Sequence, residues 1–123
     1  MSNILVVDDV AVICEFVADT LKGENYNLTS ATSGREALEF CKEIDFDLLI
    51  TDLLMPDMDG FELMSLVRKT LPDIKIIVMT AGGAISSKDY LDLASKRLHV
   101  SAALEKPLDQ AQLIEETRKA LEN

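Results

Sequence analysis

Short apolar runs alternate with amphipathic segments along the whole chain. The runs cover residues 4–7, 27–31, 48–52, 74–80 and 100–104, and the second is more polar than the others. Continuous apolar runs of this length predict strands buried on both faces, as in a parallel sheet covered by helices. The polar character of the second run predicts a strand nearer an edge of the sheet.

Between these runs, hydrophobic residues recur every three or four positions, which predicts helices. The predicted helices cover 10–22, 60–70 and 88–98, and two more begin at Ser33 and Asp109. Ser33, with Glu36 three residues later, has the pattern of a capping box. Asp59 is the expected cap of the third helix, and Gly23 is the expected stop of the first.

Five predicted strands alternate with five predicted helices, which indicates an α/β fold. Short connections and right-handed crossovers favour a doubly wound, five-stranded parallel sheet. One of the two common strand orders, 2-1-3-4-5, is the flavodoxin-like one. In that order the first and third strands are neighbours, so Asp8 and Asp9 after one would lie beside Asp52 at the end of the other.

Composition narrows the class of protein. The 123 residues are 48% hydrophobic but only 5% aromatic, which predicts one domain over residues 1–123 with an aliphatic core. The formal net charge of −10 argues against non-specific binding to nucleic acid or to an anionic membrane surface. No stretch is long enough to span a bilayer and no signal peptide is evident, so a cytoplasmic location is expected.

Cys14 and Cys41 both fall inside predicted amphipathic helices. They are interpreted as reduced, buried core residues, with a disulfide as the weaker alternative.

The three acids at the predicted sheet edge need a compensating charge. Two like charges ~5 Å apart repel by roughly 3 kcal/mol at an effective dielectric near 20. A divalent cation bound by Asp8, Asp9 and Asp52 would remove that repulsion. Oxygen ligands at few positions suit Mg²⁺, whereas Ca²⁺ takes more protein oxygens and Zn²⁺ prefers nitrogen or sulfur.

Two further residues follow strands of the same sheet. Thr80 ends the fourth strand with a hydroxyl, and Lys106 follows the fifth with an ammonium group. Carboxylates, a metal, a hydroxyl and a lysine together describe a site for phosphoryl transfer, with Asp52 as the nucleophile. Each residue alone is more simply a cap, a strand end or a surface residue. Their shared position at one sheet edge favours the joint role.

These residues resemble the receiver domain of two-component response regulators. The matching segments are Val6-Val7-Asp8-Asp9, the run from Thr51 to Gly60, Thr80-Ala81 and Lys106-Pro107. The resemblance spans nearly the whole chain, and this set of motifs in this order is highly specific.

The resemblance implies that Asp52 accepts a phosphoryl group from a histidine kinase or a phosphotransfer protein. It implies that Asp9, Asp52 and the Leu54 backbone carbonyl bind Mg²⁺ directly, while Asp8 helps through water. It also implies that Lys106 and Thr80 contact the phosphoryl group and that the Lys106-Pro107 bond is cis.

The chain departs from the family pattern at a few positions. Ala103 stands where an aromatic switch residue is usual, so the coupling of Thr80 to that aromatic is absent. We expect the segment 82–88 and the helix after it to carry the signalling change. Leu54 and Gly82 occupy positions that tune the lifetime of the phosphoryl group, and neither can orient an attacking water, which predicts slow self-dephosphorylation.

The expected protein is therefore a signalling switch rather than a turnover enzyme. It would act alone or as part of a longer regulator, through an unidentified downstream protein, a phosphorelay or a homodimer formed by the last helix and fifth strand. Two alternatives stay open. One is a degenerate receiver that serves only as an interaction module. The other is a Mg²⁺-dependent aspartyl phosphatase, against which Leu54 argues because a general acid usually stands there.

Overall fold

The computed structural model describes residues 1–81 and 98–122. The strands are β1 (Ser2–Val7), β2 (Tyr26–Ala31), β3 (Leu48–Asp52), β4 (Lys75–Thr80) and β5 (Ala102–Glu105). The helices in the described part of the chain are α1 (Ala11–Leu21), the short 3₁₀ helix η1 (Lys22–Glu24), α2 (Gly34–Glu43), α3 (Gly60–Thr70) and α5 (Gln110–Glu122). The helix expected over 88–98 lies outside the described residues, apart from the helical Leu98.

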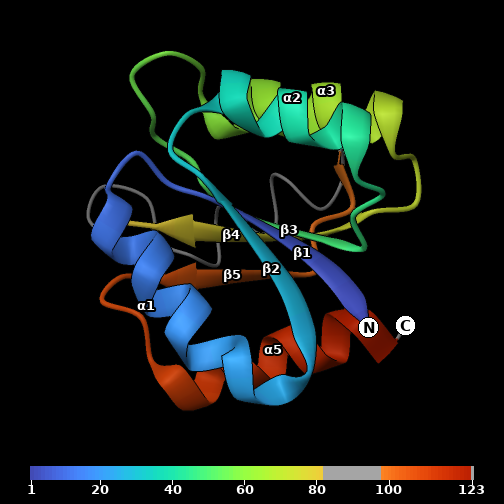
Figure 1. Ribbon diagram of the computed structural model, residues 1–123. Helices are drawn as coiled ribbons and strands as arrows, with labels where there is room; N and C mark the ends of the chain where they lie inside the picture. The colour runs from blue at the N-terminus through green and yellow to red at the C-terminus, as the bar shows by residue number, and fades with distance from the viewer. Residues whose placement is uncertain (82–97, 123) are drawn as a thin grey trace.

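The five strands form one parallel sheet in the order β2-β1-β3-β4-β5. The predicted order is confirmed, and β2 is an edge strand as its polar sequence indicated. α2 and α3 lie side by side over one face of the sheet, and α1 and α5 cover the other (Figure 1). The fold is therefore the doubly wound, flavodoxin-like arrangement.

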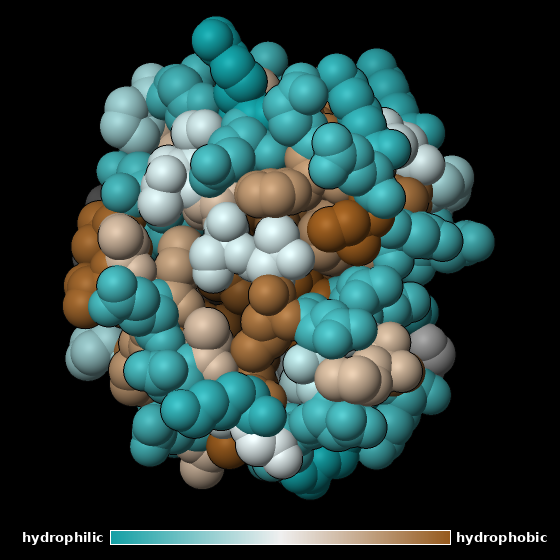
Figure 2. Space-filling model, viewed as in Figure 1, coloured by the Kyte–Doolittle hydropathy of each residue, from teal (hydrophilic) through white to brown (hydrophobic). Residues whose placement is uncertain are grey.

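The sheet separates two aliphatic cores. Alternate residues of a strand point to opposite faces, so Leu5 and Val7 belong to the core under α2 and α3, while Ile4 and Val6 belong to the core under α1 and α5. On the face seen in Figure 2, hydrophilic side chains surround a central band of more apolar ones. No helix within the described ranges combines the length and the apolar character needed to cross a membrane.

Side chains cap two of the helices where the sequence predicted it. The Ser33 hydroxyl accepts a hydrogen bond from the Glu36 amide at 3.1 Å, and the Asp59 carboxylate accepts one from the Glu62 amide at 2.8 Å. The Glu36 side chain accepts in return from the Thr32 amide at 2.9 Å, one residue earlier than an ideal capping box. These caps fix where α2 and α3 begin.

Several predicted boundaries were wrong by one or two residues, including the start of β1 at Ser2 rather than at Ile4, and two of the differences have a clear physical reason. Gly23 does not stop the first helix, because η1 continues it and Asn25 takes the left-handed conformation at φ 65°. Asn tolerates that conformation, since its short polar side chain can hydrogen-bond locally. The last strand covers 102–105 rather than 100–104, because Ala102 and Glu105 pair with Ile77 and Thr80 of β4.

The two cysteines are free and buried, as expected. Burial is the main reason why the pKa of the Cys14 thiol rises to about 11, and it also raises the pKa of Cys41. Both are thus neutral core groups at physiological pH.

Candidate functional site

The predicted acids meet at the carboxyl edge of the sheet. β1 and β3 are hydrogen-bonded neighbours, with Val7 opposite Thr51, so the residues that follow them lie side by side. Carboxylate oxygens of Asp8, Asp9 and Asp52 lie within 4.8 Å of one another. The convergence of these acids, far apart in sequence, is confirmed.

Asp8 is the most enclosed of the three acids. Its side chain is 0% exposed, and both carboxylate oxygens have partners. Oδ1 accepts from the Val10 amide at 2.9 Å, and Oδ2 accepts from Lys106 Nζ at 2.7 Å. Asp8 is therefore more than a loop acid: it holds the start of α1 and anchors the lysine.

Asp52 lies at the centre of the site and is 7% exposed. Its Oδ1 accepts from the Leu53 amide at 2.9 Å and lies 3.5 Å from Lys106 Nζ. Burial raises the pKa of Asp52 and repulsion from Asp8 adds to this, while Lys106 and the backbone amides of Leu53 and Leu54 oppose it. This carboxylate is poorly solvated and close to a cation, which suits a nucleophile.

Lys106 reaches the site from the turn after β5. Its amide donates to the Thr80 carbonyl at 2.7 Å, which joins the ends of β4 and β5. Burial by itself lowers the pKa of the Lys106 ammonium, but the hydrogen bond to Asp8 and the attraction of Asp52 together raise it. The lysine is therefore charged at neutral pH. The Lys106-Pro107 bond is cis, as the resemblance implies.

The donor set fits a hard divalent cation. Three carboxylates face one ammonium group, which leaves an excess of about two negative charges in a partly buried crevice. Both carboxylate oxygens of Asp8 already accept hydrogen bonds from protein donors, whereas Asp9 is exposed. Asp9 and Asp52 are thus the residues best placed to offer oxygen ligands, and an all-oxygen set suits Mg²⁺.

The structure also describes three of the other predicted site residues. Thr80 is 2% exposed at the end of β4, and Leu54 is 67% exposed after β3. Ala103 lies in β5, partly buried against the core under α2 and α3, so no aromatic side chain occupies its position. Gly82 lies outside the described residues, as do the segment 82–88 and nearly all of the helix expected after it.

The sequence predicted Gly60 as the start of a helix, but not its close packing against the phosphoacceptor strand. A Cβ atom added to Gly60 would lie 2.7 Å from the Asp52 carbonyl oxygen and 2.8 Å from Leu53 Cα. The Gly60 amide donates to the Leu53 carbonyl at 2.9 Å. The start of α3 is thus pressed against the backbone of Asp52. A glycine after a helix cap is the only sequence signal, and it does not reveal the close approach.

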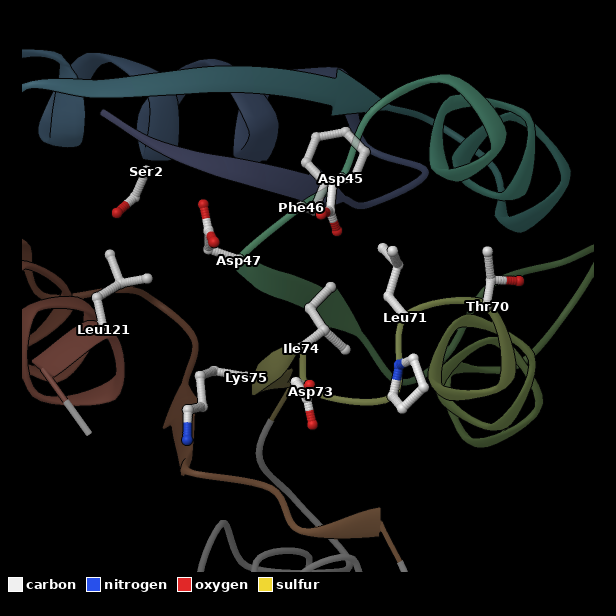
Figure 3. A pocket seen from close by; sticks show the side chains of 11 residues that line it. Ser2, Asp45, Phe46, Asp47, Thr70, Leu71, Asp73, Ile74, Lys75 and Leu121 are labelled. Atoms are coloured by element: carbon white, nitrogen blue, oxygen red, sulfur yellow. The ribbon is translucent and has the colours of Figure 1, made fainter.

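A separate pocket lies at the opposite edge of the sheet (Figure 3). Its volume is about 610 Å³, and its lining includes Ser2, Asp47 and Lys75 from the amino ends of β1, β3 and β4. Asp47 Oδ2 accepts from the Asn3 amide at 2.8 Å, so this carboxylate holds the start of β1. Asp45 and Asp73 also line this pocket, but among the described residues only Asp8, Asp9 and Asp52 bring their carboxylate oxygens close enough together to hold a metal ion. The carboxyl edge is also where ligands bind in such sheets.

Asp52→Asn should stabilise the metal-free protein by about 1–2 kcal/mol, because it removes one of three clustered charges and leaves Lys106 paired with Asp8. The folded-state pKa of Asp52 is raised, so ionised Asp52 costs stability as pH rises through that pKa. The gain should therefore be present at pH 7 and vanish below about pH 4, where the carboxyl is protonated in both states. Urea melts in EDTA at both pH values measure it, and a loss of stability at pH 7 would contradict the clustering.

Known proteins are similar to this chain in sequence and in fold. Residues 4–118 match the family described as response regulator receiver domain. The response regulator receiver protein CpdR of Brucella abortus is 32% identical over 121 residues, which cover 98% of each chain. The transcriptional regulatory protein ZraR of Escherichia coli K12 is 36% identical over 121 residues, 97% of this chain. The chain spans about a quarter of the length of the transcriptional regulators that it matches.

Solved structures agree with this assignment. The chemotaxis protein CheY4 of Vibrio cholerae superposes with a TM-score of 0.86 at 29% identity, over 98% of this chain and 99% of that one. A CheY-like receiver domain protein of Methanospirillum hungatei superposes with a TM-score of 0.87 at 27% identity, over 99% of this chain and 94% of that one. The chain belongs to the response regulator receiver domain family of two-component systems.

Proposed function

We propose that the protein is a phosphorylation switch in which Asp52 accepts a phosphoryl group from a histidine kinase or a phosphotransfer protein. The observation that carries the proposal is the meeting of Asp8, Asp9, Asp52 and Lys106 at one sheet edge. Family membership supports it, since receiver domains are phosphoacceptor signalling domains rather than classical enzymes.

In the proposed step, a carboxylate oxygen of Asp52 forms a bond to phosphorus as the bond from phosphorus to the donor histidine nitrogen breaks. The imidazole leaves with the electron pair of that bond. Lys106 Nζ, 3.5 Å from Asp52 Oδ1, neutralises charge on the phosphoryl oxygens, and Asp8 keeps the ammonium in place. Thr80, at the end of the neighbouring strand, donates its hydroxyl to the phosphoryl group.

Asp9, Asp52 and the Leu54 carbonyl would hold Mg²⁺ in this proposal, and Asp8 would support it through water. When bound, Mg²⁺ supplies positive charge that offsets the clustered acids and the incoming phosphoryl oxygens. The signal then passes to a partner protein or onward by phosphorelay. A second copy bound through α5 and β5 is one form that this output can take.

Incubation with acetyl phosphate and Mg²⁺, followed by intact mass measurement, tests the proposal. A switch gains one phosphoryl group, and Asp52→Asn abolishes the addition. Continuous release of phosphate would indicate an aspartyl phosphatase instead. Absence of any addition would indicate an interaction module, the reading that the small side chain of Ala103 favours. Glu62→Gln, a carboxylate change on the exposed start of α3, is the matched control and should be phosphorylated normally.

The phosphoryl group should be long-lived. Leu54 is 67% exposed two residues after Asp52, and its apolar side chain can shield the site but cannot orient a water for attack. We expect a half-life of many minutes, measured by the decay of the phosphorylated mass after the donor is removed. Leu54→Asn restores a group that can hold a water and should shorten the half-life several-fold. Decay of the unsubstituted protein within seconds would contradict the expectation.

A further inference from the structure

A groove between α2 and α3 lies away from the phosphoacceptor site. Its volume is about 440 Å³, and the lining residues among those described are Arg35, Leu38, Glu39, Lys42, Met58, Leu66, Lys69 and Thr70. Leu38, Met58 and Leu66 are partly exposed and give the groove an apolar floor. The two helices that form it lie side by side on one face of the sheet (Figure 1).

The charges on the rim of this groove are opposite to those of the chain as a whole. The whole chain has 22 acidic and 12 basic residues. Four charged residues line the groove, and three of them, Arg35, Lys42 and Lys69, are basic. The single acid, Glu39, is paired with Lys42 at 3.0 Å. Arg35 and Lys69 make no salt bridge within the described residues, so the residues that line the groove carry a net positive charge.

From these features we propose that the α2–α3 groove docks an acidic amphipathic helix of a partner protein. A helix fits a groove between two helices by placing its apolar stripe on the floor. Acidic residues beside that stripe would meet Arg35 and Lys69, which favours them over a basic partner. The described helices of a second copy are poorer occupants, because α1, α2, α3 and α5 each bury apolar residues in their own core.

The apolar floor of the groove is connected through Met58 to the loop that follows Asp52. Met58 belongs to that loop, and a Cβ atom added to Gly34 at the start of α2 would lie 2.9 Å from Met58 Sδ. The neighbouring Asp57 carboxylate accepts from the Arg35 amide at 3.5 Å. Met58 is therefore held against α2 and forms a fixed part of the docking surface. The proposal does not depend on phosphorylation of Asp52, because these contacts exist in the unmodified protein.

Two synthetic helices test the proposal on the unmodified chain of 123 residues. Both carry leucines at three- and four-residue spacing, and one is flanked by glutamates and the other by lysines. Anisotropy titrations should show that the glutamate helix binds at least about fivefold more tightly, the product of a few exposed charge pairs. In methyl NMR spectra, addition of the glutamate helix should cause the largest chemical-shift changes at Leu38, Met58 and Leu66.

Charge reversals give the matched comparison. Arg35→Glu and Lys69→Glu should each weaken binding of the glutamate helix about threefold or more, whereas Lys119→Glu on α5 makes the same charge change elsewhere and should leave it unchanged. Equal binding of both helices, shifts outside the groove or absence of binding would each overturn the proposal. Sedimentation showing a dimer with shifts at Met58 would make a second copy the occupant and would also overturn it. The Arg35→Glu and Lys69→Glu variants should still be phosphorylated normally. A failure of the docking proposal can therefore be distinguished from a failure of the proposed phosphorylation switch.

Discussion

Replacing Lys106 with methionine should lower the free energy of unfolding by about 3–5 kcal/mol, because it leaves a buried carboxylate without its counter-charge. Asp8 is 0% exposed and bonded to Lys106 Nζ at 2.7 Å, and Asp52 lies 3.5 Å from the same nitrogen. The methionine keeps the length and the apolar stem of lysine, so the loss reports the ammonium group. Urea unfolding at pH 7 in EDTA measures it.

Lys42→Met is the control for Lys106→Met. Lys42 is also in a salt bridge, with Glu39 at 3.0 Å, but its side chain is 69% exposed. The Lys42→Met substitution should therefore lower the free energy of unfolding by less than about 1 kcal/mol. Adding Asp8→Asn to Lys106→Met should recover a large part of the lost stability, since it removes the buried Asp8 carboxylate that Lys106 no longer neutralises. A loss of under about 1 kcal/mol for Lys106→Met, or no recovery in the double variant, would show that the pair is not buried in solution.

Gly60→Ala should cost about 2–3 kcal/mol, because the new methyl group meets backbone rather than a side chain that can turn away. The contacts are 2.7 Å to the Asp52 carbonyl oxygen and 2.8 Å to Leu53 Cα. Relief of these contacts requires α3 or the end of β3 to shift. We therefore expect phosphorylation of Asp52 by acetyl phosphate to slow as well, measured by intact mass against time.

Gly23→Ala is the matched substitution. A Cβ atom at Gly23 has no atom within 4 Å, so this change should be neutral or stabilise the protein by a few tenths of a kcal/mol to about 1 kcal/mol. It should leave phosphorylation unchanged. Equal stability of both variants would mean that the start of α3 moves freely away from Asp52, which would contradict the packing described above.

Sequence patterns were sufficient for the sheet and for the meeting of the acids. Apolar runs identified the strands, including the more polar one over 27–31, and the strand order then brought Asp8 beside Asp52. Caps at Ser33 and Asp59 were predictable because a side chain that bonds a free helix amide has a recognisable spacing. These features depend on local hydrogen-bonding chemistry or on the spacing of hydrophobic residues along the chain.

Contacts that a residue makes with the backbone of a distant segment were not predictable from the sequence. Arg68 donates to the carbonyls of Pro72, Ile74 and Leu98, tying the end of α3 to two later segments, and no pattern in the sequence marks it. The same is true of Gly60 against Asp52 and of Asn25 in place of Gly23 as the left-handed residue. A sequence shows which groups can bond, whereas the partner of a carbonyl is settled only when the elements pack.

The division of the interior by the sheet also distributes the five methionines of the chain usefully. Met55 and Met64 lie in the core under α2 and α3, Met58 packs against that core, and Met79 lies in the core under α1 and α5. Met1 is 71% exposed at the amino terminus. Isotope labelling at methionine alone would thus give separate spectroscopic reporters for the two halves of the molecule. A disturbance at Asp52 could be assigned to the half that responds without any engineered probe.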